Sequence, residues 1–173
     1  MKKIKTQVKI LMGSDSDLEV MSDAAKVFED FGVAHEIIVA SAHRSPEFVH
    51  KHISNAKTQG VQVIIAGAGG AAHLAGVCAS LTTLPVIGVP VKAKTLDGLD
   101  SLLSTVGMPP GVPVATVGIN SSKNAGLLAV QILALSDVIL SKKMIEYKKK
   151  MAIEIENKAE KLSKLGYKKY LGQ

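Results

Sequence analysis

Five short runs of apolar, mostly β-branched residues alternate along the chain with longer segments of helical periodicity. The runs cover residues 8–12, 36–40, 61–66, 85–89 and 113–117. Most of them are apolar at successive positions, which is typical of strands that are buried on both faces of a parallel sheet. Strands that alternate with helices in this way predict an α/β fold with helices on both sides of the sheet.

The segments between these runs carry the expected helices. Residues 17–31 place apolar side chains at helical spacing, and Gly32 follows as a residue suited to end the helix. Ser16 and Glu19 form an S-x-x-E pattern, which predicts a capping box at the helix start. Five strand–helix units predict a doubly wound, flavodoxin-like three-layer αβα sandwich, whose ligands bind beyond the carboxyl ends of the strands. The further helices are expected over residues 46–59, from about 72, over 96–104 and over about 123–140.

Residues 142–173 follow a different pattern. Up to about residue 166 one apolar stripe runs along an otherwise charged helix, formed by Met144, Tyr147, Met151, Ile155, Ala159 and Leu162. Because the sheet already has its covering helices, this stripe has no expected place on its own subunit. We expect a catalytic domain over residues 1–141 and a C-terminal helix over residues 142–173 that packs on a neighbouring subunit.

The net charge of +6 at first suggests a nucleic-acid partner. Its position argues against one, because residues 1–141 hold 11 basic and 11 acidic residues, whereas residues 142–173 hold ten Lys and four Glu. Aromatic residues make up only 3% of the chain and Trp is absent, so a base-stacking surface is not expected. We interpret the lysine-rich tail as a solvated helix face and expect no nucleic-acid partner.

The cysteine content and the apolar runs bear on the compartment. Cys78 is the only cysteine, which excludes an internal disulfide and fits a reducing environment. The basic start, residues 1–5, is followed by an apolar run shorter than the roughly 7–15 residues of an export signal. No run approaches the roughly 20 apolar residues that span a bilayer. We expect a cytoplasmic protein with no membrane partner.

The first strand is followed by Gly-Ser-Asp-Ser-Asp at residues 13–17. The hydroxyls of Ser14 and Ser16, together with the free backbone N–H groups of a helix start, suit an anion site. The same residues also suit a capped helix start with no further role. The pattern leaves both interpretations open.

The second strand is followed by Ser41, Ala42, His43 and Arg44. Arg44 is the only arginine among 21 basic residues, and its planar guanidinium suits phosphate or carboxylate recognition better than a lysine does. A structural ion pair is the alternative. Histidine is the side chain best suited to act as a general acid–base near neutral pH, so His43 is a candidate for that role, although a histidine without a catalytic role is the alternative.

The third strand is followed by small residues at positions 67–72 and then by His73. Such residues let the backbone approach a ligand closely. The run is not a dinucleotide fingerprint, because Ala72 occupies the last glycine position, and the chain has no G-x-x-x-x-G-K-[ST] motif. His73 either donates to a ligand or caps the next helix. With no H-E-x-x-H pair and no cysteine cluster, we do not expect metal catalysis.

Three later segments are less informative. Lys92 follows the fourth strand, and residues 108–113 form a rigid turn that either closes over a site or only connects two elements. Asn120 and Asn124 follow the fifth strand, where they either cap a helix or contact a base or sugar.

With these loops in order, the chain resembles the family of 5-(carboxyamino)imidazole ribonucleotide mutases, the catalytic subunits of phosphoribosylaminoimidazole carboxylase. Several of the matching stretches are runs of small residues with low individual specificity, and their joint order and spacing carry the resemblance. The stretches are MGSDSD (12–17), SAHRSPE (41–47), VIIAGAGGAAHLAG (63–76), LPVIGVPV (84–91), LDSLLS (99–104) and MPPGVPVATV (108–117).

The resemblance implies a homo-octamer with active sites at subunit junctions, and no cofactor or metal. It implies that Ser14, Asp17 and Arg44 bind a phosphorylated imidazole ribonucleotide, the last two at its ribose or phosphate end. His43 carries over as the general acid–base. The remaining substrate-binding residues carried over are Ser16, Ser41, Ala42, Ala68, Gly69, Gly70, Ala71, His73 and Leu74.

The family reaction belongs to de novo purine biosynthesis. The carboxylate leaves an amino nitrogen as enclosed carbon dioxide and is recaptured by the ring carbon, so the enzyme is an isomerase. The alternative is a related branch, a lyase that carboxylates aminoimidazole ribonucleotide directly and has Lys where this chain has Arg44. A non-catalytic nucleotide-binding or signalling module is a further alternative. A signalling receiver would need a strand-end aspartate, which none of the five runs has.

Three positions depart from the commonest family pattern. Ser45 stands where Thr is usual, Ala75 where Pro often follows His-Leu, and Gly107 where Gln is usual. The first change is conservative, and the other two bear on the expected lid and on the helix beside the pocket.

Overall fold

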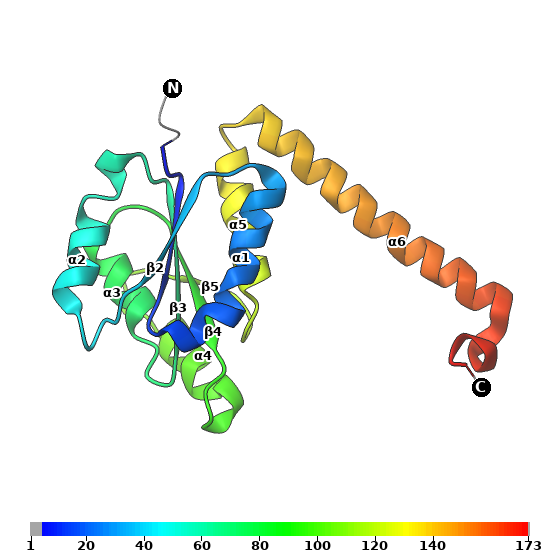
Figure 1. Ribbon diagram of the computed structural model, residues 1–173, viewed down its shortest axis with the longest axis horizontal. Helices are drawn as coiled ribbons and strands as arrows, with labels where there is room; N and C mark the ends of the chain where they lie inside the picture. Colours follow the sequence, from blue (N-terminus) through cyan, green and yellow to red (C-terminus); the bar gives the residue numbers. More distant parts are fainter. Residues whose placement is uncertain (1–4, 173) are drawn as a thin grey trace. The chain divides into compact units, whose positions relative to one another are not determined.

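The computed structural model describes residues 5–172, so residues 1–4 of the basic start, like residue 173, lie outside the described part of the chain (Figure 1). The chain divides into two compact units, the first ending at Leu133 and the second beginning at Ala134. The first unit contains the sheet and the helices that cover it. The second consists mainly of one long helix.

The first unit is built on a five-stranded sheet whose neighbouring strands are all parallel. The strands lie in the order β2-β1-β3-β4-β5, the flavodoxin-like order, which confirms the predicted fold class. Every residue of β1 and β4 is buried, including the charged Lys9 within the otherwise apolar run of β1. The strand bounds are β1 (Val8–Met12), β2 (His35–Val39), β3 (Val63–Gly69), β4 (Val86–Val91) and β5 (Ala115–Thr116).

Helices cover both faces of the sheet (Figure 1). On one face α5 packs closely on α1, because a Cβ added to Gly126 would lie 3.1 Å from Cα of Ala24. On the other face α3 and α4 lie together, since a Cβ on Gly88 would meet both Thr105 and Ala75. The helices are α1 (Leu18–Phe31), α2 (Pro46–Ser54), α3 (Leu74–Leu81), α4 (Leu99–Val106) and α5 (Ser122–Ala134), with 3₁₀ turns η1 (Asp15–Asp17), η2 (Lys57–Gln59) and η3 (Leu96–Gly98).

The only cysteine of the chain belongs to the core between the sheet and the α2–α3 layer. Cys78 lies on α3 and is fully buried, in a cluster that includes Leu11, Ile38 and Ile53. Burial raises the pKa of its thiol to about 12. The thiol therefore stays protonated at neutral pH and acts as a small apolar side chain.

The predicted capping box of α1 is wrong by two residues. The box pairs Ser14 with Asp17: the Ser14 hydroxyl accepts from the N–H of Ser16, and the Asp17 carboxylate accepts from the N–H of Ser14 at 3.2 Å. Because the 3₁₀ turn η1 directly precedes α1, the helical segment begins closer to β1 than predicted. The C-terminal prediction is confirmed, because Gly32 ends α1 in the left-handed conformation with φ of 74°.

The boundary between the last two helices also differs from the prediction, which placed it near residue 141. The helix α5 ends at Ala134, and α6 (Val138–Tyr170) begins four residues later. The carboxylate of Asp137 accepts hydrogen bonds from the N–H groups of Ile139 and Leu140 and so caps α6. The apolar residues on either side of Asp137 hid this break in the hydrophobic pattern.

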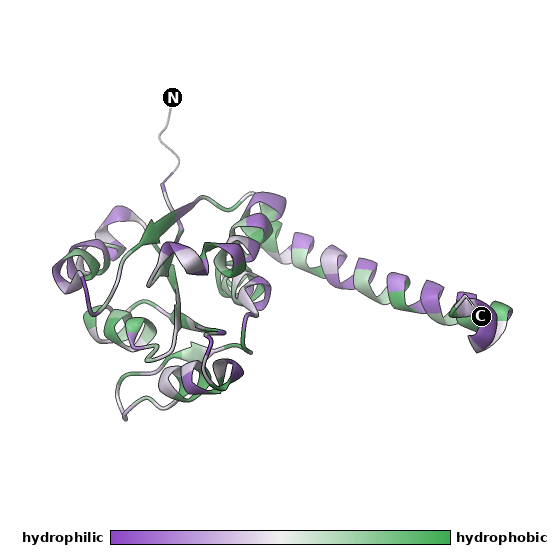
Figure 2. Ribbon diagram, turned by 60° about the horizontal axis from the view of Figure 1, so that its bottom comes forward, coloured by the Kyte–Doolittle hydropathy of each residue, from purple (hydrophilic) through white to green (hydrophobic). Residues whose placement is uncertain are grey.

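The second unit is dominated by α6, along which polar and apolar residues alternate (Figure 2). Leu140 and Met144 near its start are buried, whereas Met151, Ile155 and Leu162 of the predicted stripe are 50%, 63% and 43% exposed. Gly166 interrupts the helix with φ of 70°. Within residues 5–172 no helix is long and apolar enough to cross a membrane. Packing of α6 on a neighbouring subunit stays a prediction.

Candidate active site

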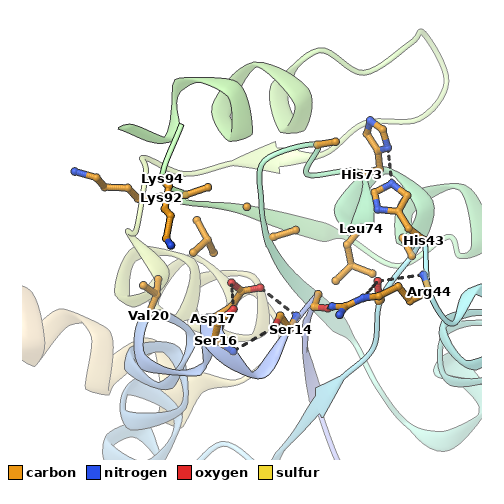
Figure 3. Close-up of a pocket in the computed structure, with 18 of the residues that line it drawn as sticks. Ser14, Ser16, Asp17, Val20, His43, Arg44, His73, Leu74, Lys92 and Lys94 are labelled. Carbon is orange, nitrogen blue, oxygen red and sulfur yellow. Dashed lines mark hydrogen bonds between the residues drawn. The ribbon is translucent and has the colours of Figure 1, made fainter. Parts of the chain in front are cut away.

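The carboxyl ends of β1 to β4 lie at one edge of the sheet and surround a cavity of about 900 Å³ (Figure 3). This is the edge at which doubly wound sheets bind ligands. Every residue proposed from the sequence as a site residue lines the cavity, except Gly70. Three loops that are far apart in the sequence are thus brought together, while what each residue binds stays a prediction.

The backbone of Gly70 forms hydrogen bonds with side chains of α4 and does not line the cavity. Its N–H donates to the Ser101 hydroxyl at 2.9 Å, and its carbonyl accepts from the Ser104 hydroxyl at 3.2 Å. The fully buried Ser101 in turn donates to the carbonyl of Val91 at the end of β4, at 2.8 Å. One hydroxyl therefore joins the loop after β3 to the end of β4, and Gly70 has a structural task rather than a free N–H for a ligand.

The loop after β1 presents Ser14, Ser16 and Asp17 to the cavity (Figure 3). Asp17 is only 8% exposed, and its oxygens accept from the N–H of Ser14 and from the hydroxyl of Ser16. Burial raises the pKa of Asp17 above its ordinary value, although these two hydrogen bonds and the nearby charge of Arg44 act in the opposite direction. Desolvation therefore outweighs the stabilisation that a helix start gives to a charged carboxylate.

The loop after β2 is closed on itself by serines. The hydroxyl of Ser45 accepts from the N–H of Ser41 at 3.1 Å and donates to the carbonyl of Ser41 at 3.2 Å. Both bonds need only a hydroxyl, so Ser45 supplies the bonding group that a threonine would. The closed loop presents Ser41, Ala42, His43 and Arg44 to the cavity.

Arg44 joins the loops after β1 and β2. Its Nη2 donates to the carbonyl of Gly13 at 2.8 Å, and its Nε donates to the Ser41 hydroxyl at 3.4 Å. These bonds hold the guanidinium at the cavity without using all five of its N–H donors. No ion pair of Arg44 is found among the described residues, so the geometry favours a guanidinium that still has donors for an anionic ligand.

His43 and His73 meet across the cavity wall. Nε2 of His43 lies 2.8 Å from Nδ1 of His73, and the rings stand at 76° to each other. Figure 3 shows the pair above Leu74 and Arg44. Since His73 immediately precedes α3 but makes no side-chain capping bond, the ligand-facing interpretation of this histidine is favoured over the capping one.

A second wall of the cavity comes from the ends of β4 and β5 and was not assigned from the sequence. It includes Lys92, Lys94 and Asn120. The Oδ1 of Asn120 accepts from the N–H of Lys92 at 2.7 Å, and Nζ of Lys92 lies 2.7 Å from Oδ1 of Asp97. Lys92 had been noted only as following a strand, since lysine is the commonest basic residue of this chain and carries no signal of its own.

The expected lid and the two unusual positions lie away from the cavity lining. Met108 packs on α3, because a Cβ added to Gly76 would lie 2.7 Å from its sulfur. Neither the segment 108–113 nor Ala75, Gly107 or Asn124 contributes to the lining. Ala75 is buried in the core, and Gly107 follows the end of α4. These two departures from the family pattern therefore lie outside the cavity wall.

The cavity combines a pair of hydrogen-bonded histidines, a guanidinium and hydroxyl groups around a space that fits a nucleotide-sized ligand. Within residues 5–172 no group of three or more His, Cys, Asp or Glu side chains is placed to hold a metal ion. The chemistry open to these residues themselves is proton transfer and the binding of anionic groups.

Comparison of the whole chain with known proteins shows its family. The family model described as AIR carboxylase matches residues 7–154, and the chain belongs to this family. The chain is 30% identical to the crystal structure of Treponema denticola PurE, with a TM-score of 0.81, and the match covers 92% of this chain and 98% of that one.

Full-length relatives share more than half of their residues with this chain. It is 56% identical to N5-carboxyaminoimidazole ribonucleotide mutase of Thermotoga maritima, over 96% of this chain and 98% of the relative. It is 54% identical to the protein of the same name from Pyrococcus horikoshii, over 100% and 98%. A phosphoribosylaminoimidazole carboxylase of Candida glabrata is also 56% identical, but the match covers 29% of that longer protein.

Proposed function

We propose that this protein is an isomerase of de novo purine biosynthesis that converts N5-carboxyaminoimidazole ribonucleotide to 4-carboxy-5-aminoimidazole ribonucleotide. The observation that carries the proposal is the direct contact of His43 with His73 in a cavity that also holds Arg44 and Ser14. Two relatives that match almost end to end carry the mutase name, which supports it further. The proposed reaction uses only residues of this cavity and requires neither ATP nor a metal ion.

The proposed reaction consumes one proton and releases one. The bond between the exocyclic nitrogen and the carboxylate carbon breaks, carbon dioxide leaves, and the nitrogen takes up a proton. The ring carbon then attacks the enclosed carbon dioxide, forms the new carbon–carbon bond and loses its own proton. A single group that first donates and then accepts a proton serves both steps, as imidazole does near neutral pH. We assign this role to His43.

His73 positions His43 in this scheme. A hydrogen bond between two imidazoles requires one donor and one acceptor nitrogen, so the tautomer of each ring depends on the other. Because Nε2 of His43 faces His73, the orientation of the His43 ring and the proton on this nitrogen are both set by that contact. When His43 gives up or gains a proton, the bond to His73 stabilises whichever ring carries the charge.

The other cavity residues bind the nucleotide. Arg44 and Ser14 are placed to donate to anionic oxygens, and Asp17 to accept from a ribose hydroxyl. The small residues Ala68, Gly69 and Ala71 let the flat base approach the backbone of the loop after β3. Ser16, Ser41, Ala42 and Leu74 complete the proposed contacts.

We also propose a homo-octamer in the cytoplasm. Exposed large apolar side chains on α4 and α6 support assembly, since burying such side chains against another subunit is favourable. The single cysteine supports a reducing compartment. Light scattering of the purified protein would give the assembly mass directly.

An assay without ATP tests the reaction. The purified protein is incubated with N5-carboxyaminoimidazole ribonucleotide in the absence of ATP and added bicarbonate, and the carboxylated product is followed by its absorbance. A parallel sample receives aminoimidazole ribonucleotide with bicarbonate. Turnover of the first substrate at low enzyme concentration supports the mutase, whereas turnover of only the second identifies a direct carboxylase instead.

A further inference from the structure

The cavity has two walls, and the proposed reaction uses only one of them. The loops after β1, β2 and β3 supply all the residues assigned so far. The ends of β4 and β5 form the second wall, where Lys92 and Lys94 lie across the cavity from His43 and Arg44 (Figure 3). Two cations on a wall without an assigned function call for an explanation.

The proposed substrate has more anionic groups than the first wall has cations to bind them. The nucleotide carries a phosphate at one end and a carboxylate on its base, and the first wall holds a single permanent cation, Arg44. Two anionic groups at opposite ends of one ligand cannot both reach that guanidinium, which also donates to Gly13 and Ser41. A second cation on the opposite wall meets the group that Arg44 leaves unpaired.

The backbone around Lys92 is held in place from two sides. The N–H of Lys92 donates to Oδ1 of Asn120, and the N–H of Asn120 donates to the carbonyl of Pro90 at 2.9 Å. On the other side Ser101 donates to the carbonyl of Val91 at 2.8 Å. The backbone of Asn120 is in the left-handed region, with φ of 56°, a conformation that asparagine tolerates better than most residues. The Cα of Lys92 is thus anchored at the cavity edge, and its side chain is the part that is able to move.

The side chain of Lys92 is occupied by a weak partner. Its Nζ lies 2.7 Å from Oδ1 of Asp97, and the two side chains are 52% and 86% exposed. Exposed ion pairs of this kind are screened by water and contribute little. Asp97 and the preceding Leu96 both have positive φ, of 52° and 48°, in a segment where the backbone is strained. A phosphate or carboxylate inside the cavity, where water is partly excluded, is a better partner than this exposed carboxylate.

We infer that Lys92 is a substrate-binding residue that exchanges Asp97 for an anionic oxygen group of the nucleotide when the substrate enters. The inference rests on the proposed function for the identity of the ligand. Asp97 then acts as a competing internal anion that holds the lysine at the cavity edge until the substrate arrives. The inference therefore predicts that substitutions of Lys92 and of Asp97 change the ligand affinity in opposite directions. A purely structural ion pair does not predict opposite changes.

The test measures equilibrium binding of 4-carboxy-5-aminoimidazole ribonucleotide by calorimetry. Lys92→Gln should raise Kd on the order of 10- to 100-fold, the usual effect of losing a charge-assisted hydrogen bond. Asp97→Asn should lower Kd by roughly two- to fivefold, because it removes the competing anion. Lys92→Arg should restore most of the affinity. Equal changes in the same direction for Lys92→Gln and Asp97→Asn, or no change in either, would overturn the inference.

The chain offers a matched control. Lys26 on α1 also lies 2.7 Å from an aspartate, Asp23, in an exposed pair outside the cavity, so Lys26→Gln removes the same charge from the protein. Its Kd should equal that of the wild type, and a change as large as that of Lys92→Gln would show a general charge effect and overturn the inference. Thermal unfolding of each variant checks that the fold is intact.

Two fragments identify the group that Lys92 meets. Ribose 5-phosphate carries only the phosphate, and 5-aminoimidazole-4-carboxylate carries only the base carboxylate. Weaker binding of either fragment to Lys92→Gln supports the inference and names the anion, whereas unchanged binding of both fragments and of the full nucleotide overturns it. Because Kd reports binding and does not require conversion of the ligand, a wild type that binds these ligands but does not convert the substrate would refute the proposed reaction alone.

Discussion

Nε2 of His43 and Nδ1 of His73 lie 2.8 Å apart, so these two residues, 30 positions apart in the chain, share one hydrogen bond at the edge of the cavity. The contact exists because β2 and β3 both flank β1 in the sheet and the loops after β2 and β3 open toward the same space. A proton added to or removed from one ring changes whether the facing nitrogen of the other ring must donate or accept the hydrogen bond. The pair is therefore the unit whose protonation we expect to govern turnover.

Replacement of His43 tests this unit most directly. His43→Asn keeps a similar size and some hydrogen bonding but cannot carry a proton, so kcat should fall on the order of 10²- to 10⁴-fold while product binding is kept. Steady-state kinetics and calorimetry measure the two effects separately. A fall of less than about tenfold, with intact binding, would move the role of proton carrier to His73.

Arg44→Lys keeps the charge but loses the planar fork. Lysine cannot bond Gly13 and Ser41 while it also donates to a ligand in the same geometry, so substrate binding should weaken by about 1.5–3 kcal/mol for each bond lost. The Kd for the product and the midpoint of thermal unfolding are the two measurements. Near-normal affinity together with lower stability would make Arg44 a purely structural residue.

Asp17→Asn should change the pH dependence of stability. Burial raises the pKa of Asp17 above 3.8, so the folded protein holds this proton more tightly than the unfolded chain does. The stability that the protonated group contributes is fully present below pH 3.8 and is lost as the pH rises through the raised pKa. Asparagine does not ionise, and its amide oxygen still accepts from Ser14.

The free energy of unfolding of Asp17→Asn relative to the wild type should therefore increase with pH and level off above the raised pKa. Urea titrations at several values between about pH 3.5 and about pH 7 measure this difference. A difference that falls as the pH rises would mean that the carboxylate is stabilised in its charged form.

A charge placed on the exposed stripe of α6 should disrupt assembly. Ile155 is 63% exposed, so Ile155→Lys should leave each subunit folded while it lowers the mass of the oligomer in light scattering. Asn157→Lys adds the same charge about 200° around the helix and serves as the control. If both variants keep the wild-type mass, the stripe is not a subunit contact.

Gly88→Ala should destabilise the sheet by about 1–3 kcal/mol through overpacking. The new Cβ would lie 2.8 Å from Cγ1 of Val114 and would also press on Cγ2 of the buried Thr105. Thr105→Ser removes that methyl group but keeps the hydroxyl that donates to Ser101. The double variant should therefore recover part of the loss in urea unfolding, and strict additivity of the two changes would contradict the proposed clash.

The parts of the fold that depend on local pattern were predictable. The run at residues 8–12 became β1 without a shift, and Gly32 ended α1 as expected, because a buried strand and a left-handed helix end each leave a signal within a few residues. The start of α1 was not predictable from the local pattern. Two overlapping capping boxes are possible there, Ser14 with Asp17 and Ser16 with Glu19. The pattern alone does not choose between them.

The site was predictable where its residues stand out by type. The sole arginine and a histidine at a strand end pointed to the loop after β2. Lys92 did not stand out among 20 lysines, and for Asn120 the sequence left a capping role and a ligand contact open. Their importance depends on β4 and β5 being neighbours, which is a property of the sheet. The raised pKa of Asp17 likewise depends on burial by other elements, which no local sequence pattern reports.

The buried thiol of Cys78 makes this chain a convenient subject for spectroscopy. With its pKa raised to about 12 and no exposed surface, the thiol is shielded from maleimides and similar reagents at neutral pH. Any cysteine introduced on the surface would then be the only one to react. A dye placed on α6 in one batch of protein and a second dye in another would report subunit exchange by energy transfer, without first removing a native cysteine.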